Sequence, residues 1–417
     1  MKKFILFILL LGVVTCGLNA QFVYENRVYS PLIKTVMLHK NGDVLSQPVI
    51  SLQKNGTLLL EFDELREDTR RYEYTLIHCN SDWMQSKLDR DLYVEGFDVQ
   101  PIENYENSFN TVQRYVHYSQ TVPSGDMRLL KSGNYIIKVF TEGNPDNVVF
   151  TRRMYVAEDC AETELEIKPS SDASLMKTHQ EVNVRVSGKN GMFFSNPEQF
   201  MKVIAVQNGN EYSSHQLKMR GMSGNKIDYS FDQSNQFFAG NDFRFFDMTS
   251  LRLKTQYIAK FDFQNGQNQV YLLKERIKSR LPYSYDKDLN GKFYIRNEYG
   301  SNPSTESDYA WVHFFLPMPQ TLEGAYYVLG DMNNWRADAN SKMNFADGQY
   351  HVSLYLKQGY YNYQILFRYN NDTQLLTAPA EGNFSETNNV YTVYVYYHDF
   401  SDDYDRLLGT LTVEYNR

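Results

Sequence analysis

Histidine, cysteine and clustered carboxylates are the side chains that most often hold a metal ion, and in this chain they are scattered. Neither a His-Glu-x-x-His motif nor a Cys-x-x-Cys motif occurs. A metal site needs ligands that converge at fixed spacing. We therefore predict no metal site and interpret each histidine as a hydrogen-bonded or solvated strand residue; the eight are His39, His78, His117, His179, His215, His313, His351 and His398.

The densest acidic cluster is Ser-Asp-Asp-Tyr-Asp at residues 401–405. It lacks the glycine and the terminal glutamate of a calcium-binding loop, so we expect a solvated turn. A Gly-x-Ser-x-Gly nucleophile elbow and a phosphate-cradling loop are both missing from the sequence. Paired glycosidase carboxylates can lie far apart in a chain, so an enzyme acting on carbohydrate stays an alternative without positive support. We predict no catalytic residues and no cofactor.

One motif points toward ligand binding. Residues 330–335 read Gly-Asp-Met-Asn-Asn-Trp and follow an apolar strand pattern. This stretch resembles the early-Set sandwich domains that accompany starch- and glycogen-active enzymes. An exposed Trp335 would stack on the face of a sugar, whereas a buried Trp335 would close the end of a core. We favour the buried position and keep a periplasmic or surface glycan-binding protein as the alternative function.

The first twenty residues are typical of a secretory signal peptide. Met-Lys-Lys is followed by an apolar run at residues 4–14 and by a small residue, Ala20, which predicts cleavage between Ala20 and Gln21. The apolar run is too short to span a bilayer. A lipoprotein signal ending at Cys16 is the rival interpretation, but Thr15 is larger than the residue expected before an acylated cysteine.

Only Cys79 and Cys160 remain after this cleavage. A single disulfide between them is one interpretation for an oxidising compartment, and two buried free thiols is the other. Removal of Lys2 and Lys3 changes the net charge from −8 to −10, without a long block of one sign. Nucleic acid needs a basic stripe on its partner, so we predict no nucleic-acid binding.

The secondary-structure signal is alternation with period two, which predicts β-strands. It recurs along the chain, for example at residues 57–62, 134–140 and 181–186, and Asn-Gly turn signals separate the strands. Aromatic residues make up 15% of the chain, and 33 of its residues are tyrosines, which suits sheets with one buried face. The predicted fold class is all-β.

The strand pattern predicts three consecutive β-sandwich domains, immunoglobulin- or fibronectin-like or early-Set-like. An acidic, apolar-poor stretch at 158–164 and a charged stretch at 274–280 separate the blocks. We therefore expect a signal peptide at 1–20 and domains at 21–158, 159–283 and 284–417.

The first block carries a denser resemblance. Its motifs lie in order at residues 72–83, 93–97, 105–111, 115–118, 132–135 and 151–154, and the C-terminal motifs lie at 381–384, 391–397 and 404–407. These stretches are similar to the type IX secretion system plug proteins. The resemblance implies a non-enzymatic periplasmic protein without a small-molecule substrate. It would associate with the outer membrane by capping the large translocon β-barrel.

The resemblance supplies no catalytic or partner-binding residues. We interpret Trp83, Phe97 and Tyr135 as core anchors, because large aromatic residues suit packing. The sequence Asn80-Ser81-Asp82 predicts a turn. Arg152 and Arg153 would pair with acidic groups of a partner or, as the commoner case, be exposed strand charges.

Overall fold

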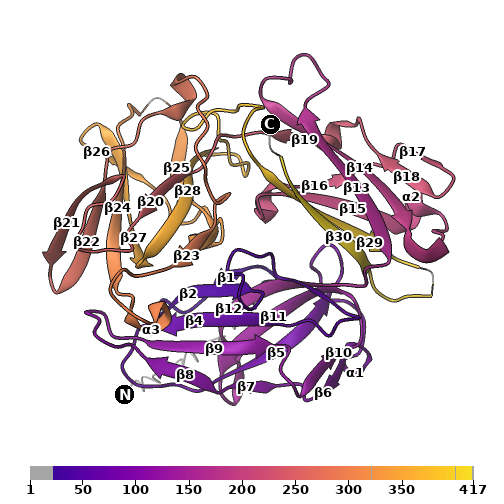
Figure 1. The fold of residues 1–417 in the computed structure, drawn as a ribbon, viewed down its shortest axis with the longest axis horizontal. Coiled ribbons are helices and arrows are strands. Elements are labelled where there is room, and N and C mark those ends of the chain that lie inside the picture. Colours follow the sequence, from indigo (N-terminus) through magenta and orange to yellow (C-terminus); the bar gives the residue numbers. More distant parts are fainter. Residues whose placement is uncertain (1–21, 321, 400, 416–417) are drawn as a thin grey trace, which may run out of the picture.

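The computed structural model describes residues 22–320, 322–399 and 401–415. Strands dominate these residues, which confirms the all-β class. Figure 1 shows them as groups of sheets around a common centre. Each helix has only four residues: α1 (Arg90–Tyr93), α2 (Pro197–Phe200) and α3 (Pro303–Glu306). None of the described helices is long and apolar enough to cross a membrane. Short 3-10 turns are η1 (Lys189–Gly191), η2 (Glu211–Ser213), η3 (Gln233–Asn235), η4 (Lys278–Arg280) and η5 (Asp331–Asn333).

The first sandwich encloses one hydrophobic core between two sheets. Alternate residues of its strands, such as Leu58, Leu60 and Phe62, are buried in that core. One sheet has the order β1 (Arg27–Val28), β12 (Asn144–Ala157), β11 (Gly133–Thr141), β5 (Tyr72–Cys79) and β7 (Gln100–Ile102), with β3 (Val49–Ser51) beside β12. The facing sheet has the order β2 (Ile33–His39), β4 (Leu58–Glu64), β9 (Val116–Val122) and β8 (Asn104–Asn107), and β6 (Val94–Gly96) pairs with β10 (Met127–Leu129).

The middle sandwich combines strands from two distant parts of the chain around a second core. Its first sheet contains β13 (Ala161–Pro169), β14 (His179–Gly188), β18 (Lys226–Tyr229) and β17 (Gly221–Ser223), with β19 (Gln236–Phe238) beside β14. Its second sheet has the order β16 (Ser214–Leu217), β15 (Met201–Gln207), β29 (Val390–Tyr397) and β30 (Arg406–Glu414).

The third sandwich has its core between two further sheets. In one, β28 (Gly359–Tyr369) pairs with β20 (Arg244–Asp247), β23 (Phe293–Ile295) and β25 (Gly324–Leu329). The other has the order β21 (Ile258–Gln264), β22 (Gln267–Leu272), β24 (Tyr309–Leu316), β27 (Gln349–Lys357) and β26 (Asn344–Ala346).

The strand pairing differs from the expected boundary between 283 and 284. Met201 lies opposite Tyr397, so the C-terminal strands complete the middle sandwich. Strands β20, β21 and β22, which were expected in the middle block, pair within the third. Figure 1 shows β29 and β30 in yellow beside β15, while β28 belongs to the other group. The third sandwich is thus inserted between strands of the middle one, because alternation identifies a strand but not its partner.

A chain ending at residue 388 would lack β29 and β30. The middle sandwich would then lose half of its second sheet, and β15 would expose an unpaired edge and an apolar face. We expect residues 159–239 to become sensitive to limited proteolysis, with cleavage sites mapped by mass spectrometry. The full-length chain is the control; equal resistance of this segment in both proteins would contradict the inserted topology.

Candidate functional site at the junction of the three sandwiches

A buried ion pair joins the first and third sandwiches. Asp63 lies near the end of β4 and Lys357 at the end of β27, and Lys357 Nζ lies 2.6 Å from Asp63 Oδ2. Each side chain is only 1% exposed. Tyr309 also donates a hydrogen bond of 2.6 Å to the same carboxylate oxygen. Such a pair resists separation, because pulling the sandwiches apart leaves two charges without their partners.

Two histidines extend this pair into a network. His117 Nδ1 lies 2.7 Å from Asp63 Oδ1, and its Nε2 lies 3.3 Å from a Glu61 oxygen. Burial alone would lower the pKa of His117, but its hydrogen bonds to Asp63 and Glu61 raise that pKa to about 9. Burial would raise the pKa of Glu61, but hydrogen bonds from His117 and His39 lower it to about 2. At neutral pH His117 is therefore protonated and Glu61 is ionised.

Hydrogen bonds to backbone groups widen the same interface. The Asp308 carboxylate accepts the backbone N–H groups of Val112, at 2.7 Å, and Gln113, at 3.0 Å. Tyr115 donates its hydroxyl to the Ser307 carbonyl at 2.8 Å. Loops of the first sandwich are thus fixed to the third by charge-assisted bonds.

The first and middle sandwiches meet at the turn formed by Asn80, Ser81 and Asp82. The Trp83 N–H donates to the Asn80 carbonyl at 2.9 Å, which closes the expected turn. Asp405 accepts the Ser81 N–H at 3.1 Å and pairs with Lys202 Nζ at 3.1 Å. Asp405 was expected in a solvated turn, but it is buried because it caps this contact between sandwiches.

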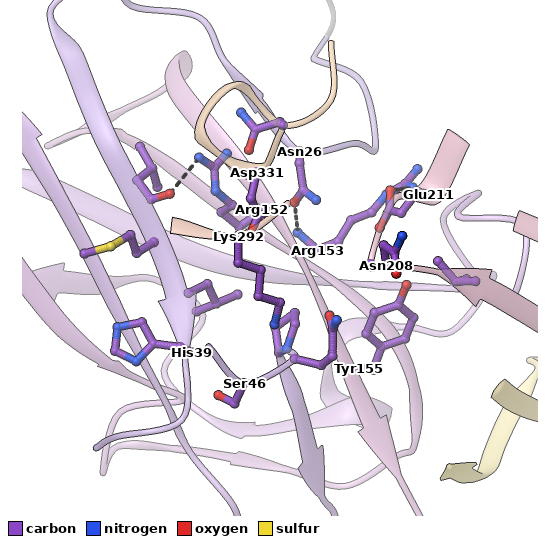
Figure 2. Close-up of a pocket in the computed structure, with 18 of the residues that line it drawn as sticks. Asn26, His39, Ser46, Arg152, Arg153, Tyr155, Asn208, Glu211, Lys292 and Asp331 are labelled. Atoms are coloured by element: carbon purple, nitrogen blue, oxygen red, sulfur yellow. Dashed lines mark hydrogen bonds and ion pairs between the residues drawn. The ribbon is translucent and has the colours of Figure 1, made fainter. Parts of the chain in front are cut away.

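A small cavity of about 100 Å³ lies where all three sandwiches meet. Figure 2 shows Arg152, Arg153, Glu211, Lys292 and Asp331 around it. Arg153 of the first sandwich pairs with Glu211 of the middle one and also donates to the Tyr24 carbonyl at 2.9 Å. Burial lowers the pKa of Arg152 to about 10, with the nearby Asp331 acting in the opposite direction. Burial likewise raises the pKa of Asp331 and lowers that of Lys292.

These contacts correct the expectation of exposed strand charges at Arg152 and Arg153. Arg152 is buried and donates to the Thr151 carbonyl at 2.9 Å and the Val36 carbonyl at 3.2 Å. Arg153 lies over the Trp83 ring, 4.1 Å from its centroid. Arg152 lies on the same side of β12 as the core residue Phe150, and its side chain reaches Val36 of the facing sheet. Arg153 lies on the opposite side of the strand, where Glu211 of the middle sandwich covers it, a contact that strand alternation does not encode.

Around the cavity, Arg153 pairs with Glu211, and Arg152 and Lys292 donate to backbone carbonyl groups. Within residues 22–320, 322–399 and 401–415, no group of three or more His, Cys, Asp or Glu side chains is placed to hold a metal ion. The aromatic pair Tyr155 and Tyr394 stacks across the first and middle sandwiches, with ring centroids 4.2 Å apart. The junction therefore serves to hold three bodies in one fixed arrangement.

The three aromatic residues expected in the core differ in how deeply they are buried. Tyr135 is fully buried in the first core. Trp83 is partly buried and packs edge-on against Tyr155. Phe97 is 69% exposed, so its assignment to the core is wrong. It lies beyond the end of β6, in the loop that leads to β7, where the chain has left the sandwich.

Trp335 is only 5% exposed and packs edge-to-face against Phe243, with ring centroids 5.7 Å apart. This burial places it in the core, as preferred from the sequence, and leaves no open ring face for a sugar.

Cys79 and Cys160 are both free thiols in the structure. Burial raises the pKa of Cys79 to about 12, which makes it a poor nucleophile. The cleavage site at Ala20 and Gln21 lies outside the described residues.

Comparison with known proteins identifies the family. Residues 33–158 match the family model described as the type 9 secretion system plug protein 1st domain. The chain belongs to the type IX secretion system plug protein family. This plug protein is also similar to a hypothetical protein from Parabacteroides merdae ATCC 43184 whose crystal structure was solved at 2.30 Å resolution. The two are 32% identical with a TM-score of 0.92, over 95% of this chain and 100% of the other.

Two biofilm-associated protein domains, the BSP domain and the B domain, match far more weakly. Their TM-scores are 0.17 and 0.18 at 7% and 8% identity. The matches cover 94% and 92% of this chain and 60% and 86% of the other chains. They carry no argument about fold or function. No curated protein sequence matches the plug protein.

Sequence reasoning missed Asp63 and Lys357. The available signal was the pattern Glu61-Phe62-Asp63, which places two acids on the outward face of a strand whose alternate residues are apolar. That pattern does not identify the ion-pair partner of Asp63, because Lys357 lies far along the chain in another sandwich.

Replacing Lys357 by methionine should remove one of the two cationic partners of the buried Asp63 and leave only His117. We expect the free energy of unfolding to fall by about 3 kcal/mol, measured by urea denaturation. Lys226→Met is the matched control, since Lys226 pairs with Glu164 on the surface, at 59% and 52% side-chain exposure. That change should cost less than about 1 kcal/mol. Equal losses in the two variants would contradict a special role for the buried pair.

Stability should also depend on pH through His117. Its folded pKa of about 9 lies above the ordinary histidine value of 6.5, so the folded state holds the proton more tightly than the unfolded state. The resulting stabilisation is fully present below pH 6.5 and is lost as the pH rises through 9. Unfolding free energies should show this loss in the wild type and much less of it in His117→Asn. Parallel pH profiles for the two proteins would refute the assignment.

Proposed function

We propose that this protein is a non-enzymatic periplasmic plug that caps the inner opening of the large outer-membrane barrel of a type IX secretion system. The observation that carries the proposal is the family match over residues 33–158. A pore wide enough for folded cargo leaks small molecules when it is idle. A body that blocks it must bind reversibly and must not deform.

The junction described above supports the mechanical part of this role. Separate sandwiches on flexible linkers would let the blocking body change shape, whereas buried interdomain ion pairs make each separation costly. The pair of Asp63 with Lys357 fixes the third sandwich to the first, and the pair of Arg153 with Glu211 fixes the middle one. The plug then acts as one rigid piece.

An exposed segment of the first sandwich has the composition of a contact surface. Between residues 97 and 112 the large apolar side chains that are exposed are Phe97, Val99, Tyr105, Phe109 and Val112. Clusters of exposed aromatic residues commonly mark protein interfaces. Residues 91–113 contain five acidic residues and neither lysine nor arginine. We propose that this apolar, acidic segment contacts the barrel.

Affinity isolation of the tagged native protein from gently solubilised outer membranes tests the proposal. We expect mass spectrometry to find the translocon barrel with the plug. Deleting the plug should make the outer membrane permeable to small molecules while secretion continues. Failure to recover an intact barrel, together with unchanged permeability in cells whose translocon is active, would overturn the function.

The contact segment has its own test. Phe97→Ser combined with Phe109→Ser should lower barrel recovery at least about tenfold, which corresponds to about 1.4 kcal/mol of binding energy. Phe193→Ser is the matched control, because Phe193 is also strongly exposed but lies in the middle sandwich. If the control and the double variant retain the barrel equally, the segment is not the contact surface, although the capping function stands.

A further inference from the structure

A second, larger cavity lies between the middle and third sandwiches. It encloses about 500 Å³, which is within the usual size of a ligand pocket. The loop after β15 supplies Asn210 and Tyr212, and β19 supplies Phe238. The third sandwich supplies Gln364, and the segment that leads back to β29 supplies Asn383. We call this cavity the amide cleft.

The lining of the amide cleft carries no formal charge. None of the described residues around it is Asp, Glu, Lys or Arg, although such residues make up 22% of the chain. His215 also lines the cleft, and burial lowers its pKa, so it is neutral at neutral pH. A charged ligand would lose its hydration there without gaining a counter-charge.

Several amide groups of the lining keep unused hydrogen-bonding capacity. Asn383 accepts the Gly240 N–H at 3.1 Å through Oδ1, and within the described residues its Nδ2 has no hydrogen-bond partner. Gln364 donates from Nε2 to the Asn241 carbonyl at 2.9 Å, which leaves its Oε1 as an open acceptor within the same residues. Asn210 accepts the Tyr212 N–H at 3.0 Å through Oδ1. Its Nδ2 has no hydrogen-bond partner among the residues that the structure describes, so it is an open donor. The cleft thus offers both donors and acceptors to a ligand.

Two aromatic side chains accompany these amides. Tyr212 is 58% exposed and Phe238 is 44% exposed. Trp335 forms part of the lining too, and its Nε1 is buried without a hydrogen-bond partner in the described part of the chain. Because this N–H group is buried, the donors that face a ligand are the amide groups and not the indole.

We propose that the amide cleft binds a neutral oligosaccharide. Sugar hydroxyls donate and accept at once, which matches unused amide groups of both kinds, and the apolar C–H faces of a pyranose ring pack on Tyr212 and Phe238. Extended peptides are instead bound chiefly through main-chain bonds to a sheet edge, and their charged side chains would find no partner here. Trp335 borders the cleft but is not a stacking platform, because its side chain is buried.

Isothermal titration of the full-length mature protein tests this site. The probes are maltotetraose, cellotetraose and tetra-N-acetylchitotetraose, which differ in linkage and in N-acetyl substitution. We expect at least one to bind with a dissociation constant below about 1 mM, because the site is small and solvent-exposed in part. Tyr212→Ala and Asn383→Ala should each weaken that binding at least about fivefold.

Tyr299→Ala is the matched control, because Tyr299 is strongly exposed in the third sandwich but does not line the amide cleft. Thermal unfolding of every variant identifies any that have lost the fold, and the two cleft substitutions provide independent readings. The inference is overturned if none of the three probes binds at about 10 mM. It is equally overturned if folded Tyr212→Ala and Asn383→Ala both bind as the wild type does, or if an uncharged peptide binds while the sugars do not.

Discussion

The shape of this protein depends on a pair of opposite charges that are hidden between two of its sandwiches. Asp63 and Lys357 lie on strands of different sheets, and each would be solvated if its own sandwich stood alone. Burial makes their association effectively all-or-none, since a single buried charge is far more costly than the pair. His117 and Tyr309 then take up further hydrogen-bonding positions of the Asp63 carboxylate, and Glu61 pairs with the other ring nitrogen of His117. The first and third sandwiches therefore have one stable relative orientation.

The inserted topology imposes a second constraint of the same kind. Because β29 and β30 return to the middle sandwich, the third sandwich is attached to it by two chain crossings, near residues 239 and 389. Two connections limit the relative rotation of two bodies much more than one connection does. The insertion also brings the linkers together at the amide cleft, where residues from both sides of the insertion line a single cavity. The chain path therefore places the charged junction of the three sandwiches and the uncharged amide cleft in the same protein.

The sequence predicted those features that depend on interactions between neighbouring residues in the chain. The turn at Asn80, Ser81 and Asp82 forms where its side chains favour a turn, and Tyr135 is buried on the inward face of its strand. Trp335 is buried as predicted, although the Phe243 ring that packs against it lies far away in the chain. Phe97 failed as a core residue because hydrophobicity alone does not tell a core residue from an exposed aromatic residue in a loop. Arg153 failed as an exposed charge because the middle sandwich covers the outward face of its strand, and Arg152 failed because its side chain turns toward Val36 within the first sandwich.

By itself the sequence determined the all-β class, the positions of strands such as those at residues 57–62, 134–140 and 181–186 and, through its motifs, the resemblance to the plug family, because alternation and turn chemistry act between near neighbours in the chain. Only the tertiary structure decided which strands share a sheet, that the third sandwich interrupts the middle one, and that Asp63 meets Lys357. It also decided that residues far apart in the chain, such as Asn210, Phe238 and Gln364, would border one uncharged cleft. These outcomes depend on contacts between residues far apart in the chain, and the energy of such contacts exists only once both partners have been brought together and dehydrated.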